Sequence, residues 1–304
     1  MKDIFDTFIK MQPIKEGLSA DKKYYAETED GRRFLLRLSD ASQYRRKKDL
    51  FDKLRDLSNL DVPMCRPIDF GYCKDGKEIY QLLGWCQGEN LEAVLPSLSQ
   101  EKQFCLGWRA GEILHQIHTL PAPAGIDEWS VRYKQLNADR LRPFEQCGLE
   151  KEKGKVLLCF IRENMHLLSS RPQCFHHGDY HLGNLLLTDT GDLSVVDWEP
   201  ADYDNFGDPW EEFVRIGNSE VHPFFTTGLI RGYFQRDPPE MFWRLLALYL
   251  SAGALMLVSW AYYLQPDELD YTVQHLREVL QWYEGMTRVI PSWYLEKLTL
   301  SSAM

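Results

Sequence analysis

The sequence predicts an α+β protein, in which a small antiparallel sheet with one helix precedes a larger, mainly helical part. Within the first 84 residues of the 304-residue chain, strand-like runs joined by Gly-containing turns lie on both sides of one helical pattern. From about residue 95 onward, apolar side chains recur at helical spacing. A short apolar hairpin at residues 184–198 interrupts the helical part. A chain of this length can bury a substantial core in each of two lobes.

The first elements are a hairpin and a helix. The runs YYAET (24–28) and RFLLRLS (33–39) flank the turn EDG (29–31), which is the pattern of two strands joined by a Gly-containing turn. Residues 42–60 then carry apolar side chains at helical spacing, with charges between them (Leu50, Phe51, Leu54, Leu57). We expect this helix to pack on the small sheet.

A second strand pair surrounds Asp75 and Gly76, and its last strand continues through LLGWCQGENL into a linker. We therefore expect an N-terminal nucleotide-binding lobe at residues 1–84, a hinge at 85–90 and a C-terminal catalytic and substrate-binding lobe at 91–304. Amphipathic patterns predict five helices in the C-terminal lobe (100–119, about 150–169, 209–217, 239–264 and 267–286).

Composition narrows the class of protein. The chain is 44% hydrophobic and 26% charged, which is ordinary for a folded globular protein. Asp3 and Asp6 interrupt the apolar residues at the N-terminus, so a secretory signal is not indicated and a cytoplasmic location is expected. The seven cysteines form no CxxC pair, which argues against a disulfide framework and against a zinc site. We expect reduced, mostly buried thiols.

The net charge of −10 is concentrated late in the chain, because residues 198–304 contain 15 acidic and 7 basic side chains. Such a field repels nucleic acid and anionic membranes and attracts cationic small molecules, although general solubility is the simpler explanation. Residues 245–264 lack charge over a length that suits a membrane span. Ser251, Gly253 and Ser259 dilute this run, so a buried core helix is expected instead.

Three oxygen-bearing side chains should converge around the late hairpin. NLLLT (184–188) and LSVVDW (193–198) read as short strands joined by the turn DTGD. The hairpin brings Asn184 near Asp197, and Asp179 lies in the loop before it. Mg²⁺ prefers such oxygen ligands, which leaves Asp179 to handle a proton. The alternative is that Asn184 and Asp197 are ordinary turn and strand-end residues.

The pattern H-G-D-x-x-x-x-N at residues 177–184, followed by Asp197 and by GDP at 207–209, resembles the catalytic and metal-binding loops of the protein-kinase-like bilobal fold. In this form it is similar to the aminoglycoside phosphotransferase family, whose relatives include choline and macrolide kinases. EGLS, FLLRL and LLGWCQGENL extend the resemblance to the phosphate loop, third strand and hinge.

The resemblance implies roles for these residues. Asp179 would be the catalytic base that accepts the proton of the acceptor hydroxyl. Asn184 and Asp197 would hold Mg²⁺ against the nucleotide phosphates. His181 is a candidate phosphate contact, with a local hydrogen-bonding role as the alternative. His177 is expected to hold the loop backbone.

The nucleotide-binding end departs from the family pattern. The third strand presents Arg37 where the family usually has Lys; Arg keeps the charge but differs in reach and geometry. The helix acid that would orient it is Asp52 by spacing, with Asp49 as the alternative. Gly17 and Ser19 fit a phosphate-covering loop, and Gly84 and Cys86 fit a main-chain adenine site. The donor is expected to be ATP or GTP.

Three functions are compatible with these residues. The first is an O-phosphotransferase acting on a polycationic, aminoglycoside-like compound, with no nucleic acid or membrane partner. The second is a metabolite kinase acting on choline, ethanolamine, a sugar or an amino alcohol. The third is a nucleotide-binding pseudokinase, for which Arg37 is the sole argument, because Asp179, Asn184 and Asp197 are all present.

Overall fold

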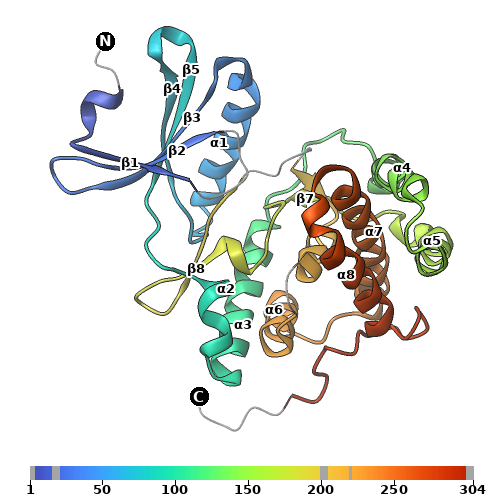
Figure 1. Cartoon of the computed structure of the whole chain (residues 1–304). Coiled ribbons are helices and arrows are strands. Elements are labelled where there is room, and N and C mark those ends of the chain that lie inside the picture. The colour runs from blue at the N-terminus through green and yellow to red at the C-terminus, as the bar shows by residue number, and fades with distance from the viewer. Residues whose placement is uncertain (1–3, 16–20, 199–204, 219–220, 299–304) are drawn as a thin grey trace. The chain divides into compact units, whose positions relative to one another are not determined.

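A computed structural model of the chain describes residues 4–15, 21–198, 205–218 and 221–298. The chain divides into two compact units (Figure 1). Unit 1 comprises residues 1–94 and 183–197, and unit 2 comprises residues 95–182 and 198–304. Unit 1 contains a five-stranded antiparallel sheet and one long helix, whereas unit 2 is mostly helical. The predicted α+β class is confirmed.

The sheet of unit 1 has the strand order β1-β2-β3-β5-β4, with antiparallel neighbours throughout. The predicted hairpin is present as β2 and β3, and Gly31 in its turn has a φ of +80°, which glycine adopts without strain. The helical and strand elements of this sheet region are η1 (Ile4–Thr7), β1 (Lys10–Ile14), β2 (Lys22–Glu27), β3 (Arg33–Asp40), η2 (Ala41–Gln43), α1 (Tyr44–Ser58), β4 (Pro67–Cys73), η3 (Lys74–Gly76) and β5 (Glu78–Gly84).

Strand β3 is buried on both faces, which explains its nearly continuous apolar sequence. Successive side chains of a strand point to opposite faces. Phe34, Leu36 and Leu38 join one apolar cluster, whereas Leu35 packs against the cluster that contains Phe51 of α1. Arg37 shares the face of Leu35, so its guanidinium lies on the side of the sheet that α1 covers.

The late hairpin forms a second sheet of unit 1, in the order β6-β8-β9. The backbone N–H of Val195 donates to the carbonyl of Pro63 at 2.8 Å. This bond and the pairing of β6 with β8 attach the hairpin to the N-terminal unit, so the boundary differs from the expected one, which placed residues 91–304 together. The elements concerned are β6 (Glu89–Asn90), α2 (Leu91–Val94), β8 (Leu185–Leu187) and β9 (Leu193–Val195).

Within the described residues, unit 2 contains six longer helices, two short strands and five 3₁₀ segments. One of these five, η6, begins in unit 2 and ends in unit 1. The helices predicted near 100–119, 150–169, 239–264 and 267–286 are confirmed, and the one near 209–217 is the 3₁₀ helix η7. The elements are η4 (Leu95–Ser97), α3 (Gln100–Ile117), α4 (Trp129–Cys147), α5 (Lys151–Asn164), η5 (Met165–Leu168), β7 (Cys174–Phe175), η6 (Leu182–Asn184), β10 (Phe206–Gly207), η7 (Glu211–Asn218), α6 (Pro223–Phe234), α7 (Glu240–Leu264), η8 (Pro266–Glu268) and α8 (Leu269–Trp282).

Helices α3 and α6 cross with their backbones almost in contact. A Cβ atom added at Gly111 of α3 would lie 2.1 Å from the carbonyl oxygen of Leu229, and one at Gly107 would lie 2.0 Å from that of Phe225. In α6, Gly228 and Gly232 approach the backbone of α3 equally closely. Each helix therefore contributes two glycines, four residues apart, to one tight crossing.

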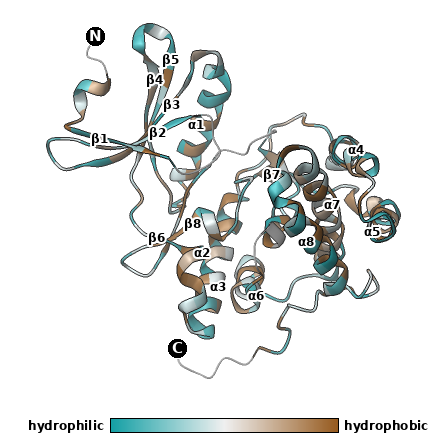
Figure 2. Ribbon diagram, in the orientation of Figure 1, coloured by the Kyte–Doolittle hydropathy of each residue, from teal (hydrophilic) through white to brown (hydrophobic). Residues whose placement is uncertain are grey.

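Helix α7 is the long apolar segment that the sequence suggested as a core helix, and much of it is brown in Figure 2. Its length and hydropathy would also suit a membrane span, but 72% of its most apolar window is buried inside the protein. This burial is that of a core helix. All seven cysteines are free; Cys105 and Cys159 are exposed, so the expectation of mostly buried thiols holds only for part of the set.

Candidate active site

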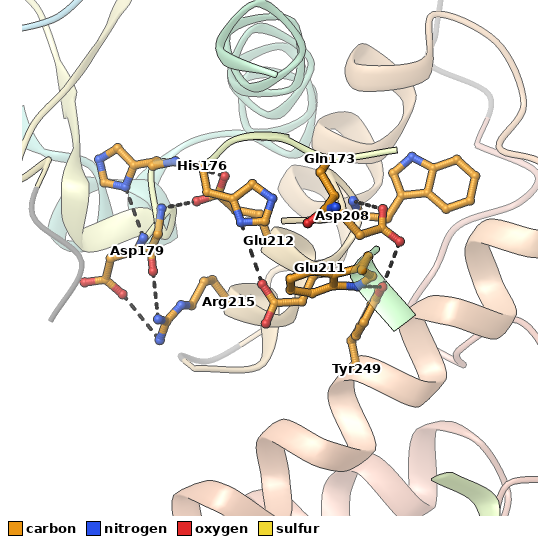
Figure 3. A network of polar contacts seen from close by, with 12 residues as sticks. Gln173, His176, Asp179, Asp208, Glu211, Glu212, Arg215 and Tyr249 are labelled. Atoms are coloured by element: carbon orange, nitrogen blue, oxygen red, sulfur yellow. Dashed lines mark hydrogen bonds and ion pairs between the residues drawn. The ribbon is translucent and has the colours of Figure 1, made fainter. Parts of the chain in front are cut away.

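The loop that carries Asp179 is fixed through its backbone by a buried acid from η7 (Figure 3). Glu212 accepts the N–H of His177 at 3.1 Å and also that of Gly178. Its other contact is with Nε2 of His118, at 2.9 Å. Burial favours a raised pKa for Glu212, but the hydrogen bond with His118 and the nearby histidines outweigh it and hold the pKa at about 2. Glu212 is therefore ionised and committed to the loop.

Asp179 lies at the accessible end of this loop, with 40% of its side chain exposed. Its carboxylate is 3.4 Å from Nε2 of His181 and 3.5 Å from Nη1 of Arg215. Burial favours a raised pKa for Asp179, but the hydrogen bond with His181 and the charge of Arg215 hold its pKa at about 2. Such a carboxylate orients a hydroxyl at neutral pH and accepts its proton only when that proton becomes acidic.

The expectation that His177 holds the loop backbone is confirmed, because its Nδ1 accepts the N–H of Asp179 at 3.2 Å. His181 contacts the carboxylate of Asp179, as described above. Arg215 was not anticipated from the sequence. It donates to the carbonyl of Gly178 at 2.7 Å and so fixes the loop from the side opposite Glu212. Its position in a 3₁₀ helix 36 residues after Asp179 gave no sequence signal.

A pocket in unit 2 begins beside this loop, at Gly178 and Arg215. Its wall is formed by side chains from α4, η7 and α7. Several of its polar atoms have no hydrogen-bond partner among the described residues, including Asn137 Oδ1, His176 Nε2 and Asn205 Nδ2. Buried polar atoms in this state normally bind water or a ligand. These atoms are therefore available to water or to a ligand in this pocket.

The charged side chains of this pocket are balanced in sign. Glu211 is 3.7 Å from Nη1 of Arg140 and 3.8 Å from Nδ1 of His176. Glu212 is committed to the loop and Arg215 faces Asp179. The pocket therefore contains two carboxylates and two guanidinium groups, and it is not the strongly acidic surface that a polycation would bind best.

The segment at residues 207–209 is anchored by a buried acid. Asp208 is fully buried and receives two hydrogen bonds from Arg171, at 2.6 and 2.9 Å. Tyr249 of α7 donates to the same carboxylate at 2.7 Å, and Trp129 of α4 donates to the hydroxyl of Tyr249 at 2.9 Å. This chain ties α4, α7 and the segment before η7 together.

The predicted metal ligands lie in unit 1. The N–H of Val196 donates to the backbone carbonyl of Asn184 at 3.0 Å, which brings Asn184 beside the end of the hairpin strand. Asp197 follows with a φ of +59°, a left-handed conformation that Asp tolerates better than most residues. Its carboxylate is 39% exposed. Carboxylate and amide oxygens are the donors that Mg²⁺ prefers, so the residue types fit this ion.

Arg37 is buried beside two side chains that the sequence analysis did not assign. Its Nη2 lies 3.0 Å from Asp21, and the same carboxylate lies 2.6 Å from Nζ of Lys47 in α1. Asp52, the acid expected to orient Arg37, instead pairs with Lys48 of its own helix, and its side chain is 46% exposed. That pairing was wrong, because Asp52 lies on the solvent side of α1, whereas Lys47 faces the sheet.

Two of the four other residues predicted for the nucleotide site belong to the described part of the chain. Gly84 ends β5, and its N–H donates to the carbonyl of Arg66 at 2.8 Å, so this N–H is not available to an adenine ring. Cys86 follows in the linker, where its Sγ is 2.8 Å from Sγ of Cys65. Gly17 and Ser19 lie outside the described residues.

Comparisons with known proteins agree with this geometry. The model of the APH family, described as the phosphotransferase enzyme family, matches residues 10–243. A search of curated protein sequences finds no relative.

Solved structures with a similar fold include an amicoumacin kinase in complex with AMP-PNP, Ca²⁺ and Ami, at 16% identity, covering 94% of this chain and 93% of that one, with a TM-score of 0.63. A choline/ethanolamine kinase family protein from Mesorhizobium loti is 15% identical, with coverage of 92% and 91% and a TM-score of 0.62. A streptomycin–ATP complex of APH(2″)-IIa is 16% identical, with coverage of 90% and 92% and a TM-score of 0.62.

Proposed function

The chain belongs to the phosphotransferase enzyme family, and on that premise we propose that it transfers the γ-phosphate of ATP or GTP to a hydroxyl group of a small molecule. The observation that carries this proposal is the state of Asp179. Two side chains of opposite charge, Glu212 and Arg215, fix the loop around it, and its pKa of about 2 keeps it ionised.

In the proposed reaction, Asp179 orients the acceptor hydroxyl for in-line attack on the γ-phosphate. Because its pKa is low, it takes the proton late, when the bond to phosphorus is largely formed. His181 keeps the carboxylate aligned through their 3.4 Å contact. Positioning of this kind accounts for much of the rate enhancement in phosphoryl transfer.

The donor is proposed to bind to unit 1. Asn184 and Asp197 would hold Mg²⁺, which supplies positive charge to the phosphate oxygens. Arg37 adds a buried guanidinium on the same side of the sheet, 3.6 Å from Asp197. ATP is the donor supported by the nucleotides in the similar structures, and GTP stays an alternative.

For the acceptor, we propose a small polar molecule with several hydroxyl groups. The pocket beside Gly178 supports this proposal, because its charges are balanced and its unpartnered atoms suit hydroxyl groups. The second candidate is a polycationic, aminoglycoside-like acceptor, which the acidic excess of residues 198–304 favours.

The test is a panel of acceptors assayed for nucleoside diphosphate release with ATP and GTP, with Asp179→Asn as the inactive control. The panel should contain aminoglycosides, macrolides, choline, amino alcohols and sugars. Salt separates the two acceptor classes, because the KM of a polycation rises with ionic strength whereas that of a neutral polyol does not. Absence of Asp179-dependent transfer to any hydroxyl compound would contradict the proposed function.

A further inference from the structure

Two basic side chains of unit 1 lie directly opposite each other on neighbouring strands. Lys23 of β2 pairs with Arg37 of β3 in the antiparallel register, so both side chains project from the same face of the sheet. Like charges in this position repel and destabilise a sheet unless carboxylates or a bound anion compensate. From the sequence, Arg37 is expected to bind the nucleotide, whereas Lys23 has no expected role.

The two cations are held differently. Arg37 is 5% exposed and is anchored by Asp21, which is itself 3% exposed and also binds Lys47. Burial favours a raised pKa for Asp21, but hydrogen bonds from Lys47 and Ser39 and the adjacent charges lower it, so Asp21 is ionised. The buried ion pair with Asp21 therefore fixes the guanidinium of Arg37 in place.

The ammonium of Lys23 has one described partner, the carboxylate of Asp197. Nζ lies 3.3 Å from Oδ1 and 3.4 Å from Oδ2, so the ion pair is symmetrical and long. Asp197 is also 3.6 Å from Nη1 of Arg37. Since Asp197 is the carboxylate proposed to hold Mg²⁺, Lys23 needs a different anion whenever that carboxylate turns to the metal.

The charges of this cluster favour a polyphosphate. Three basic side chains, Lys23, Arg37 and Lys47, form ion pairs with two carboxylates, Asp21 and Asp197, on this mostly buried face. A cation in such a site is stabilised by an anion that reaches it from the accessible side. The accessible side is the one where Lys23 meets Asp197, because these two side chains are 12% and 39% exposed. Arg37 and Asp21 are only 5% and 3% exposed.

We propose that Lys23 is the ammonium that binds the nucleotide phosphates, and that Arg37, fixed by Asp21 and Lys47, supports it as a stationary charge. In this arrangement a lysine from the second strand replaces the lysine that the third strand lacks. Lys23 exchanges its ion pair with Asp197 for one with phosphate oxygens when the nucleotide binds. The inference rests on the proposed function, since it concerns the donor site of that reaction.

The test compares Lys23→Ala with Lys22→Ala by calorimetric titration with ATP, ADP, AMP and adenosine. Lys22 is the matched control, because it is next in the strand, points to the other face and pairs with Glu78 at 59% exposure. Lys23→Ala should weaken ATP binding about tenfold or more, as expected for a lost charge-assisted contact. The effect should decrease with the number of phosphates and vanish for adenosine, and Lys22→Ala should match the wild type.

Lys23→Arg should recover most of the ATP affinity, because it restores the charge. In metal-free buffer, Asp197→Ala should bind ATP at least as tightly as the wild type, because it releases Lys23. Wild-type ATP affinity in Lys23→Ala would overturn the inference, and so would an equal loss for adenosine and ATP, which would indicate a structural role. If the wild-type protein binds no nucleotide at all, the proposed function fails as well.

Discussion

The carboxylate of Glu212 accepts the backbone N–H of His177 at 3.1 Å, two residues before the aspartate that is proposed to orient the acceptor. Glu212 does not touch Asp179 by any described contact; it determines where the loop lies. On the other side, Arg215 binds the carbonyl of Gly178. The loop is thus held at two successive peptide groups by an anion and at the next one by a cation, which matches the polarity of the N–H and C=O groups.

The first prediction concerns this support. Glu212→Gln should lower the free energy of unfolding by about 3 kcal/mol, because it breaks a buried charged network that includes His118. It should also lower kcat while leaving the KM for the nucleotide nearly unchanged, since the loop lies in unit 2. Urea unfolding and steady-state kinetics measure the two effects. Glu211→Gln is the control, because the long contacts of Glu211 predict a change of less than about 1 kcal/mol.

The second prediction concerns the proposed base. Asp179→Asn should reduce phosphate transfer by at least about a hundredfold, the usual scale for a lost acid or base, with nucleotide binding retained. Since the pKa of Asp179 is held at about 2, its ionised form persists until the pH falls to that region. The wild-type rate should therefore show no loss from this group at pH 4–9. Unchanged turnover in Asp179→Asn would exclude the assignment.

The third prediction concerns Arg215, whose charge helps to lower the pKa of Asp179. Arg215→Ala should move that pKa upward toward its ordinary value of 3.8, so protonation of Asp179 should begin at a higher pH than in the wild type. Carboxyl NMR titration measures the shift directly. Arg215→Lys should restore the charge but not the hydrogen bond to Gly178 in full. An identical titration in Arg215→Ala would show that Arg215 acts on the backbone alone.

The fourth prediction concerns Asp21. Asp21→Asn leaves Arg37 and Lys47 without their shared buried anion and should lower the free energy of unfolding by about 3–5 kcal/mol. Adding Lys47→Met should recover part of that loss, because it removes one of the two cations that shared Asp21. Asp52→Asn, on the exposed side of α1, should change the free energy of unfolding by about 1 kcal/mol or less; urea unfolding measures all three variants.

The same aspartate gives a pH dependence of stability. The pKa of Asp21 in the folded protein lies below its ordinary value of 3.8, so the unfolded chain binds the proton more readily. The stabilisation by Asp21 is therefore present above about pH 4 and is lost as the pH falls below the unfolded pKa. Urea unfolding of the wild type and of Asp21→Asn should converge as the pH is lowered from 6 to 3. Parallel curves over this range would contradict the ionised state of Asp21.

Local patterns in the sequence identified some of the elements and missed others, including one that lines the pocket beside Asp179. The hairpin β2–β3 and the helix α1 have strong periodicity and turn residues, and both were predicted. Strand β1 was missed, because it is a short edge strand that contains Pro13. Helices α4 and α6 were also missed: α4 contains Pro143, and α6 combines two glycines with two adjacent threonines, all poor helix formers.

Side-chain partners were harder to predict than elements. Lys23 and Arg37 are 14 residues apart in sequence and meet because of the strand register, which a one-residue shift would reverse. Asp52 was chosen by spacing along α1, but the rotation of that helix about its axis decides which side chain faces the sheet. Lys47 faces it because Phe51 and Leu54, four and seven residues later, lie on the buried stripe.

The glycine crossing of α3 and α6 has a consequence for how the chain folds. Each glycine lowers the helical tendency of its segment by about 1 kcal/mol relative to alanine, so peptides of residues 100–117 and 223–234 should be poorly helical in isolation. The two helices therefore become stable together, by docking segments that are more than a hundred residues apart in the chain. Contacts of such long range form slowly. Since Tyr180 donates to the carbonyl of Ala110 in the same stretch of α3, the loop that carries Asp179 acquires this anchor only after that docking step.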